Sequence, residues 1–122
     1  MNRFAVALGY IIAATVLSPA GGQAEPAEVV YKLYCVQCHG TAGTGQGINQ
    51  TAGGLAVSAR DHTSAVQMSK LADDEIRLAI AKGGDAVQKS ELMPPWGKVL
   101  TDKEIDDLVV YLRKLCQCVV AK

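Results

Sequence analysis

The 122-residue sequence has no excess of charge of either sign, because 12 Lys and Arg residues balance 12 Asp and Glu residues. The basic residues are scattered among acidic ones, so there is no basic patch of the kind that follows nucleic-acid phosphates. No segment alternates polar and apolar residues as a strand would, and no internal repeat or low-complexity segment is present. These absences argue against nucleic-acid binding and against a β-sheet fold.

A hydrophobic run long enough to span a membrane is also lacking. After Arg3, the apolar run 4–17 has about 14 residues, whereas a spanning helix needs roughly 20. Ser18-Pro19 then breaks any helix, and Gly22-Gln23-Ala24 has small residues where a signal peptidase cuts. We expect residues 1–24 to be a cleaved signal peptide, with an uncleaved anchor as the alternative.

The mature domain expected over 25–122 is short of aromatic residues. It keeps four of them: Tyr31, Tyr34, Trp96 and Tyr111. A domain of this size has a thin apolar core, which cross-links or a cofactor often reinforce. A large flat apolar cofactor would supply the core that the side chains do not.

Three segments have helical patterns. A first helix is expected to begin at Glu25-Pro26 and run to Cys35, because proline is tolerated in a first turn and acids suit the positive end of the helix dipole. A second is expected over 72–82, ended by Gly83-Gly84, and a third over 101–115, with a Thr101/Glu104 capping box. The fold class predicted is all-α, with three to four helices and long loops, the first over 40–54.

Cys35-Val36-Gln37-Cys38-His39 has the C-x-x-C-H spacing of c-type haem attachment. Cysteines three residues apart at the end of a helix lie on one face, so both sulfurs can bond the vinyl groups on one porphyrin edge. His39 follows directly and can offer a neutral imidazole nitrogen to the iron. The motif predicts one covalently bound haem c per chain.

Three other interpretations of this motif stay open from the residues alone. Thiol exchange by a C-x-x-C pair is expected in a βαβ setting, which the all-α pattern lacks. Zinc would need a fourth ligand, and the other histidine is His62, with no second C-x-x-C at a finger-like spacing. A structural disulfide between Cys35 and Cys38 would leave the adjacent His39 unexplained.

A second axial ligand is expected from Leu92-Met93-Pro94-Pro95-Trp96. The two prolines fix φ and stiffen the segment, so that the Met93 thioether can be held at a set position. Trp96 adds a large ring whose N–H can reach a haem propionate or a carbonyl. Without haem, Met93 would be read as a core residue in a proline-rich turn. Met68 lies just ahead of the second expected helix.

The sequence resembles the class I mono-haem cytochrome c family of small bacterial periplasmic proteins. The resemblance rests on Cys35-x-x-Cys38-His39-Gly40, the glycine-rich loop 40–54, and Met93-Pro94-Pro95-Trp96 ahead of a final amphipathic helix, and it covers about 27–115. It implies a cytochrome c fold in which the first and last helices cross, loops wrap the haem, and His39 and Met93 are the axial ligands. It also implies periplasmic or membrane-bound redox partners.

Such ligation predicts electron transfer rather than enzymatic catalysis. Two strong ligands close the iron to substrate, and methionine opposite histidine raises the reduction potential. The expected function is single-electron shuttling in the periplasm, with no catalytic acid, base or nucleophile. Arg60 is a further candidate, as a contact to a haem propionate.

Cys116-Gln117-Cys118 departs from the family pattern. If the last helix continued, the two cysteines would lie on opposite sides of it, and a bridge between them would be strained in helical geometry. The alternatives are a frayed terminus with Cys116 packed or a local disulfide, a disulfide to a partner or a second copy, soft-metal binding, and a cysteine replacing Met93 on the iron.

Three functions compete with electron shuttling. One is a haem-based ligand binder or a redox or thiol sensor, with Met93 displaced by an open site or by Cys116 or Cys118. Another is a thiol- or metal-handling protein that uses Cys116 and Cys118. The last is one subunit of a multi-haem enzyme.

Overall fold

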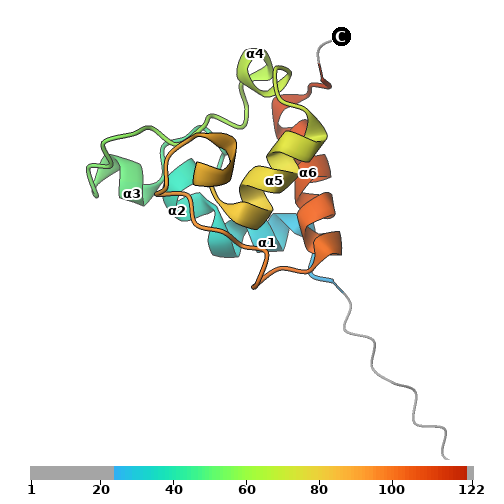
Figure 1. Cartoon of the computed structure of the whole chain (residues 1–122). Coiled ribbons are helices and arrows are strands. Elements are labelled where there is room, and N and C mark those ends of the chain that lie inside the picture. Colours follow the sequence, from blue (N-terminus) through green and yellow to red (C-terminus); the bar gives the residue numbers. More distant parts are fainter. Residues whose placement is uncertain (1–23, 121–122) are drawn as a thin grey trace, which may run out of the picture.

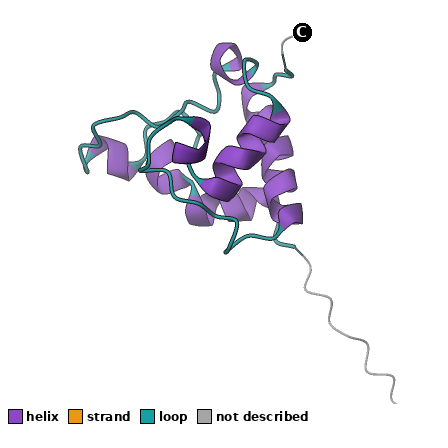
Figure 2. Ribbon diagram, viewed as in Figure 1, coloured by secondary structure: helices purple, strands orange, loops and turns teal. Residues whose placement is uncertain are grey.

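The computed structural model describes residues 24–120, and within them every regular element is a helix. Figures 1 and 2 show helices joined by long loops. The elements are α1 (Ala27–Tyr34), α2 (Val36–His39), α3 (Ile48–Thr51), α4 (Ala65–Met68), α5 (Asp73–Lys82), the 3-10 helix η1 (Asp85–Val87) and α6 (Asp102–Cys116). The predicted signal peptide lies, apart from Ala24, outside the described residues.

The predicted all-α fold is confirmed, with differences in the short elements. The three long expected helices correspond to α1, α5 and α6, although α1 begins at Ala27 with Pro26 as its N-cap. The loop expected over 40–54 contains the single turn α3, which is closed by a bond from the Thr51 hydroxyl to the Gly47 carbonyl at 3.2 Å. Single turns have too few residues to show a period in sequence.

Helix α6 forms where its sequence signals are strongest. The Thr101 hydroxyl accepts from the Glu104 backbone N–H at 3.2 Å, and the Glu104 carboxylate accepts from the Thr101 backbone N–H at 2.8 Å. This reciprocal capping box satisfies donors that the first turn would leave unpaired. One face of α6 is buried, through Ile105, Leu108, Val109, Leu112 and Cys116.

Helix α1 packs against that buried face of α6, so the first and last long helices of the described chain lie together. Val30 and Tyr31 of α1 are buried in the same apolar cluster as Ile105, and the Tyr31 ring lies 5.3 Å from the Tyr111 ring, centroid to centroid. Close aromatic pairs of this kind add to the stability gained from burial. The contact between the first and last long helices is therefore the core of the fold.

Helix α5 packs against another side of α6, and Arg77 of α5 forms ion pairs with α6. Arg77 pairs with Asp102 at 2.8 Å and with Asp106 at 2.6 Å. Three acids in its first turn and Lys82 in its last turn suit the helix dipole. The helix stops at Gly83, whose φ of +88° is costly for residues with a side chain. Between residues 24 and 120, no helix is long and apolar enough to cross a membrane.

Truncating the core should be far more costly than truncating the surface of the same helix. Ile105 is 1% exposed and Val110 is 62% exposed. We expect Ile105→Ala to lower the free energy of unfolding by about 2–5 kcal/mol, because it leaves a cavity between α1 and α6. Val110→Ala should change it by about 0.5 kcal/mol or less. Denaturant unfolding of the two variants measures both values, and equal losses would contradict this assignment of the core.

Candidate functional site

A cavity of about 1480 Å³ lies among α1, α2, α5, α6 and the loops between them. It is larger than the roughly 300–1,000 Å³ typical of sites for drug-sized ligands. Much of its wall is apolar, with contributions from Leu55, Val57, Met68, Leu71, Ile76, Ile80, Leu100, Leu108 and Leu112. A wall of this composition fits a large, flat, apolar group.

The two cysteines of the C-x-x-C-H motif line this cavity from the junction of α1 and α2. Cys35 is the residue between the two helices, and its helical backbone lets the His39 N–H donate to the Cys35 carbonyl at 2.9 Å. Cys35 and Cys38 are free thiols rather than partners in a disulfide. Burial raises the pKa of the Cys35 thiol to about 12. The Asn49 amide donates to the Cys38 sulfur at 3.6 Å.

His39 lies at the end of α2 with one ring nitrogen already engaged. Its Nδ1 is 3.0 Å from the backbone carbonyl oxygen of Arg60. A carbonyl only accepts, so Nδ1 carries the proton and Nε2 keeps a free electron pair. Burial lowers the pKa of His39, which favours the neutral imidazole. A neutral ring with an oriented Nε2 is the form that binds a metal.

The loop after the motif finishes α2 and thereby positions His39. The Gly45 N–H donates to the His39 carbonyl at 2.8 Å, and the Gly47 N–H donates to the Cys38 carbonyl at 3.0 Å. Gly45 has a φ of +80°, and a Cβ there would lie 2.5 Å from the Ala59 carbonyl oxygen. This close approach needs glycine and brings the chain near Ala59 alongside α2.

Met93 is held in the same way at the end of α5. The Gly84 N–H donates to the Met93 carbonyl at 2.9 Å, while the Trp96 and Gly97 N–H groups donate to the Ile80 and Ala81 carbonyls at 2.9 and 3.0 Å. These carbonyls belong to the last turn of α5, where helices leave acceptors unpaired. The segment carrying Met93 is therefore fixed by capping α5.

All six residues predicted for the site line the one cavity, although they come from distant parts of the sequence: Cys35, Cys38, His39, Arg60, Met93 and Trp96. The Trp96 ring packs on Tyr34, with centroids 5.1 Å apart. Among the described residues, no group of three or more His, Cys, Asp or Glu side chains is placed to hold a metal ion. The His39 imidazole, the Cys35 and Cys38 thiols and the Met93 thioether on this wall fit a covalently held haem.

Comparisons with known proteins agree with this geometry. A family model described as cytochrome c oxidase, cbb3-type, subunit III matches residues 22–112. The chain belongs to this family. It is similar to the solved structure of the KustC0563 c-type cytochrome, with 26% identity, a TM-score of 0.59, and coverage of 75% of this chain and 98% of that one. A search of curated proteins gave no match.

The chain is therefore a small mono-haem c-type cytochrome with an all-α cytochrome c fold, and its cofactor is covalently attached haem c. Its general function is haem-based electron transfer. The predicted family and cofactor are confirmed. The roles of individual site residues stay predictions, which are argued below from the geometry.

The cytochrome also has a buried pair that sequence reasoning missed. The His62 ring stacks on the His39 ring, with centroids 4.0 Å apart, and the His62 Nδ1 lies 3.0 Å from the Tyr31 hydroxyl. His62 is 8% exposed, and burial lowers its pKa well below the ordinary value. The pair packs His62 against the His39 ring at the cavity wall. Neither this stacking nor the use of the Arg60 carbonyl leaves a sequence signal, since any residue offers a carbonyl.

The C-terminal cysteines of the cytochrome do not line the cavity, and they are bonded to each other. The separation expected for a continued helix does not arise, because α6 ends at Cys116 and Gln117 turns left-handed, with φ 50° and ψ 40°. While the bond is closed, neither sulfur has the free thiolate that would replace Met93 on iron. The bond between Cys116 and Cys118 matches the alternative of a local disulfide.

We expect His62 to contribute through both its ring and its hydrogen bond. His62→Ala removes the stacking on His39 and leaves the Tyr31 hydroxyl without this partner, so it should cost about 2–3 kcal/mol in the free energy of unfolding. His62→Phe keeps a flat ring and should cost about 1–2 kcal/mol.

Denaturant unfolding of the haem-loaded proteins measures these costs. Tyr31→Phe is the matched control, because it removes the hydroxyl and keeps the packing. Its cost should be close to that of His62→Phe. Unchanged stability in all three variants would show that the pair contributes nothing.

Proposed function

We propose that this cytochrome is an exported carrier of single electrons, with haem bonded to Cys35 and Cys38 and ligated by His39 and Met93. The observation that carries the proposal is that two potential axial ligands line one cavity and that each is fixed by capping a different helix. His39 is tied through the end of α2, and Met93 through the end of α5. Backbone hydrogen bonds thus fix the segments that carry both donors.

The proximal ligand is supported by its hydrogen bond. The Arg60 carbonyl holds the proton on Nδ1 of His39, which directs Nε2 away from that bond. Partners of this kind set the tautomer and ring orientation of a ligating histidine and increase its basicity. The stacked His62 restricts rotation of the same ring.

The choice of Met93 over Met68 rests on how each is held. Both line the cavity, but Met68 is 1% exposed within the apolar cluster, on the single turn α4. Met93 precedes two prolines and is bonded through its backbone to the end of α5. A stiff segment that carries a half-buried thioether suits a ligand, whereas Met68 is a core residue.

Haem supplies one-electron redox chemistry when bound. The surrounding residues would then exclude water and keep both axial positions filled, so that the oxidation state changes with little rearrangement. No side chain of the site needs to act as an acid, base or nucleophile in this function. A carrier that meets its partners briefly needs only a small docking surface.

Export and partners follow from the predicted signal peptide over 1–24. Haem attachment and electron exchange would then take place in the periplasm, with soluble or membrane-bound redox proteins as donor and acceptor. A disulfide-linked dimer through Cys116 or Cys118 would require the intrachain bond to open first.

Met93→Leu tests the distal ligand most directly. Methionine ligation of haem iron gives a weak band at the red end of the oxidised spectrum, and we expect this band to be lost. The reduction potential should fall by an amount on the order of 0.1 V or more, within the roughly 0.8 V range set by axial ligands. Spectra recorded during a redox titration show whether the band is present and give the reduction potential.

Met68→Leu is the matched control, since it exchanges side chains of similar volume and should cost less than about 1.5 kcal/mol in stability. Its spectrum and potential should stay those of the parent protein. The assignment fails if Met68→Leu loses the band and Met93→Leu keeps it.

A second candidate function, one subunit of a larger haem enzyme, is favoured by the family description as an oxidase subunit. Size-exclusion chromatography of the protein from its native membrane and soluble fractions tests it. Elution as a free small protein supports the carrier, and elution only within a larger haem-containing assembly supports the subunit.

A further inference from the structure

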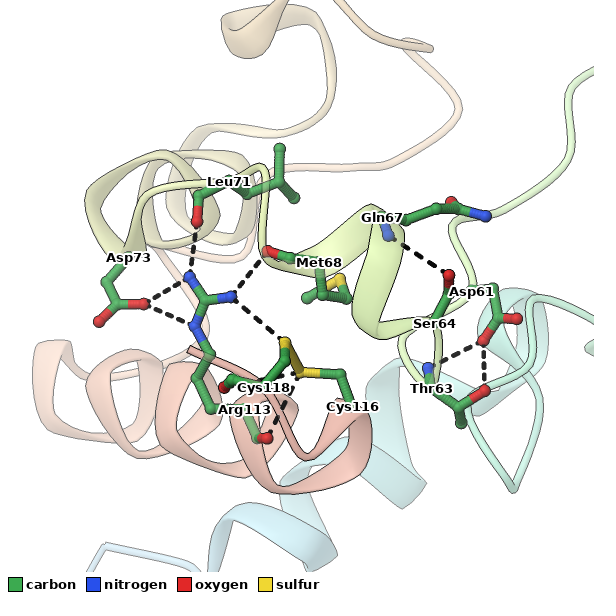
Figure 3. Close-up of a disulfide and its surroundings, with 10 residues drawn as sticks. All are labelled: Asp61, Thr63, Ser64, Gln67, Met68, Leu71, Asp73, Arg113, Cys116 and Cys118. Atoms are coloured by element: carbon green, nitrogen blue, oxygen red, sulfur yellow. Dashed lines mark hydrogen bonds and ion pairs between the residues drawn. A yellow bond between two sulfur atoms is a disulfide. The ribbon is translucent and has the colours of Figure 1, made fainter. Parts of the chain in front are cut away.

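The disulfide between Cys116 and Cys118 closes over a single residue at the end of α6. The Gln117 N–H donates to the Lys114 carbonyl at 3.2 Å, and the Cys118 N–H donates to the Arg113 carbonyl at 3.3 Å. These two bonds form a Schellman cap, which ends a helix by turning the chain back over its last turn. The cap brings Cys118 next to Cys116, as Figure 3 shows.

A bond across one residue contributes little to folding. The stabilisation from a disulfide grows with the length of the loop that it closes. The bond between Cys116 and Cys118 encloses only Gln117. The cap already turns the chain through backbone hydrogen bonds alone. A structural role therefore leaves the presence of two cysteines unexplained.

Arg113 places a positive charge beside one of the two sulfurs. Its Nη1 lies 3.8 Å from the Cys118 sulfur and donates to the Met68 carbonyl at 2.7 Å, while Nη2 donates to the Leu71 carbonyl at 2.6 Å (Figure 3). Its side chain is 13% exposed and also pairs with Asp73 at 2.7 Å. The guanidinium is thus immobilised, and a fixed cation favours a thiolate on a neighbouring cysteine.

The two sulfurs differ in access and in surroundings. Cys116 is 4% exposed and belongs to the apolar cluster, whereas Cys118 is only partly buried. The Cys116 sulfur lies 3.4 Å from the Arg113 carbonyl oxygen and 3.9 Å from the Cys118 carbonyl oxygen. A Cys116 thiol could donate to these acceptors once the bond is open. The reduced pair would therefore have an accessible thiolate and a buried, hydrogen-bonded thiol.

We propose that Cys116 and Cys118 form a thiol–disulfide exchange site whose reaction partner is a dithiol of another protein. The proposal does not depend on which residues ligate the haem. A partner thiolate attacks the Cys118 sulfur, the bond to Cys116 breaks, and Cys116 leaves as a thiolate that takes up a proton. The partner's second thiolate then attacks the partner sulfur of the mixed disulfide and releases Cys118, which is the thiolate that Arg113 stabilises.

The exchange balances in electrons and protons. The cytochrome pair gains two electrons and one proton, which Cys116 takes up while Cys118 stays a thiolate. The partner dithiol loses two electrons as it becomes a disulfide, and of its two thiol protons one passes to Cys116 and one to solvent. The reverse reaction begins with the Cys118 thiolate as nucleophile and ends with Cys116 closing the bond. Because Cys118 is the more exposed of the two cysteines, its sulfur is the one attacked in the forward reaction and the one that attacks in the reverse reaction.

The first test treats the folded, haem-loaded protein with dithiothreitol and traps free thiols by alkylation. In the haem-loaded protein, Cys35 and Cys38 are bonded to haem as thioethers. Any new thiols among the four cysteines therefore come from Cys116 and Cys118. We expect two alkyl groups per chain by mass, with a visible spectrum that matches that of the untreated protein whose haem has been reduced. Labelling that occurs only after denaturant is added would overturn the proposal.

The second test compares Cys116→Ser with Cys118→Ser, which each leave one of the two thiols. With oxidised glutathione as the probe, Cys116→Ser should form the mixed disulfide at least about tenfold faster, because its remaining Cys118 is accessible and lies beside a cation. Equal rates, or a faster Cys118→Ser, would overturn the assignment of Cys118.

Arg113→Gln and Arg113→Lys, each combined with Cys116→Ser, isolate the charge. Loss of the cation should slow the mixed-disulfide reaction several-fold near neutral pH, and lysine should restore most of the rate. The visible spectrum of each variant confirms an intact fold. A rate that Arg113→Gln leaves unchanged would remove the guanidinium from the proposal.

Discussion

Hydrogen bonds to the carbonyls at the ends of helices α2 and α5 are the interactions on which the haem site depends. A helix leaves its last carbonyls without internal partners, and in a small domain the following loop has to satisfy them. Here the loop after α2 bonds to Cys38 and His39, and the segment around Met93 bonds to α5. The same bonds that complete the helices therefore hold the two potential axial ligands in place.

This arrangement also explains how a chain with few aromatic residues forms a site large enough for haem. The core proper lies between α1 and α6, where Val30, Tyr31 and Ile105 are almost fully buried. The loops beside that core are held by backbone hydrogen bonds to α2 and α5. Haem then supplies apolar contact area that the side chains alone do not, which is consistent with covalent attachment in such a small domain.

The sequence predicted the helices whose signals are local and redundant. The capping box at Thr101 and the apolar stripe of α6 are examples, as is the C-x-x-C-H spacing, which requires particular residue types. Three features left no such signal. The Arg60 carbonyl is independent of side chain, the stacking of His62 on His39 is a tertiary contact, and Gln117 occupies a left-handed position where glycine is usual. The last of these ends α6 at Cys116, so the helical-phase argument, which holds for a continued helix, does not apply to Cys116 and Cys118.

The central claim is that the iron is closed by His39 and Met93, and a redox titration of the purified, haem-loaded protein followed by visible spectroscopy tests it most directly. The account predicts a single one-electron transition, a methionine-dependent band at the red end of the oxidised spectrum, and a reduced form that binds carbon monoxide only slowly. Absence of that band together with rapid carbon monoxide binding would contradict it, because both results indicate an open axial position.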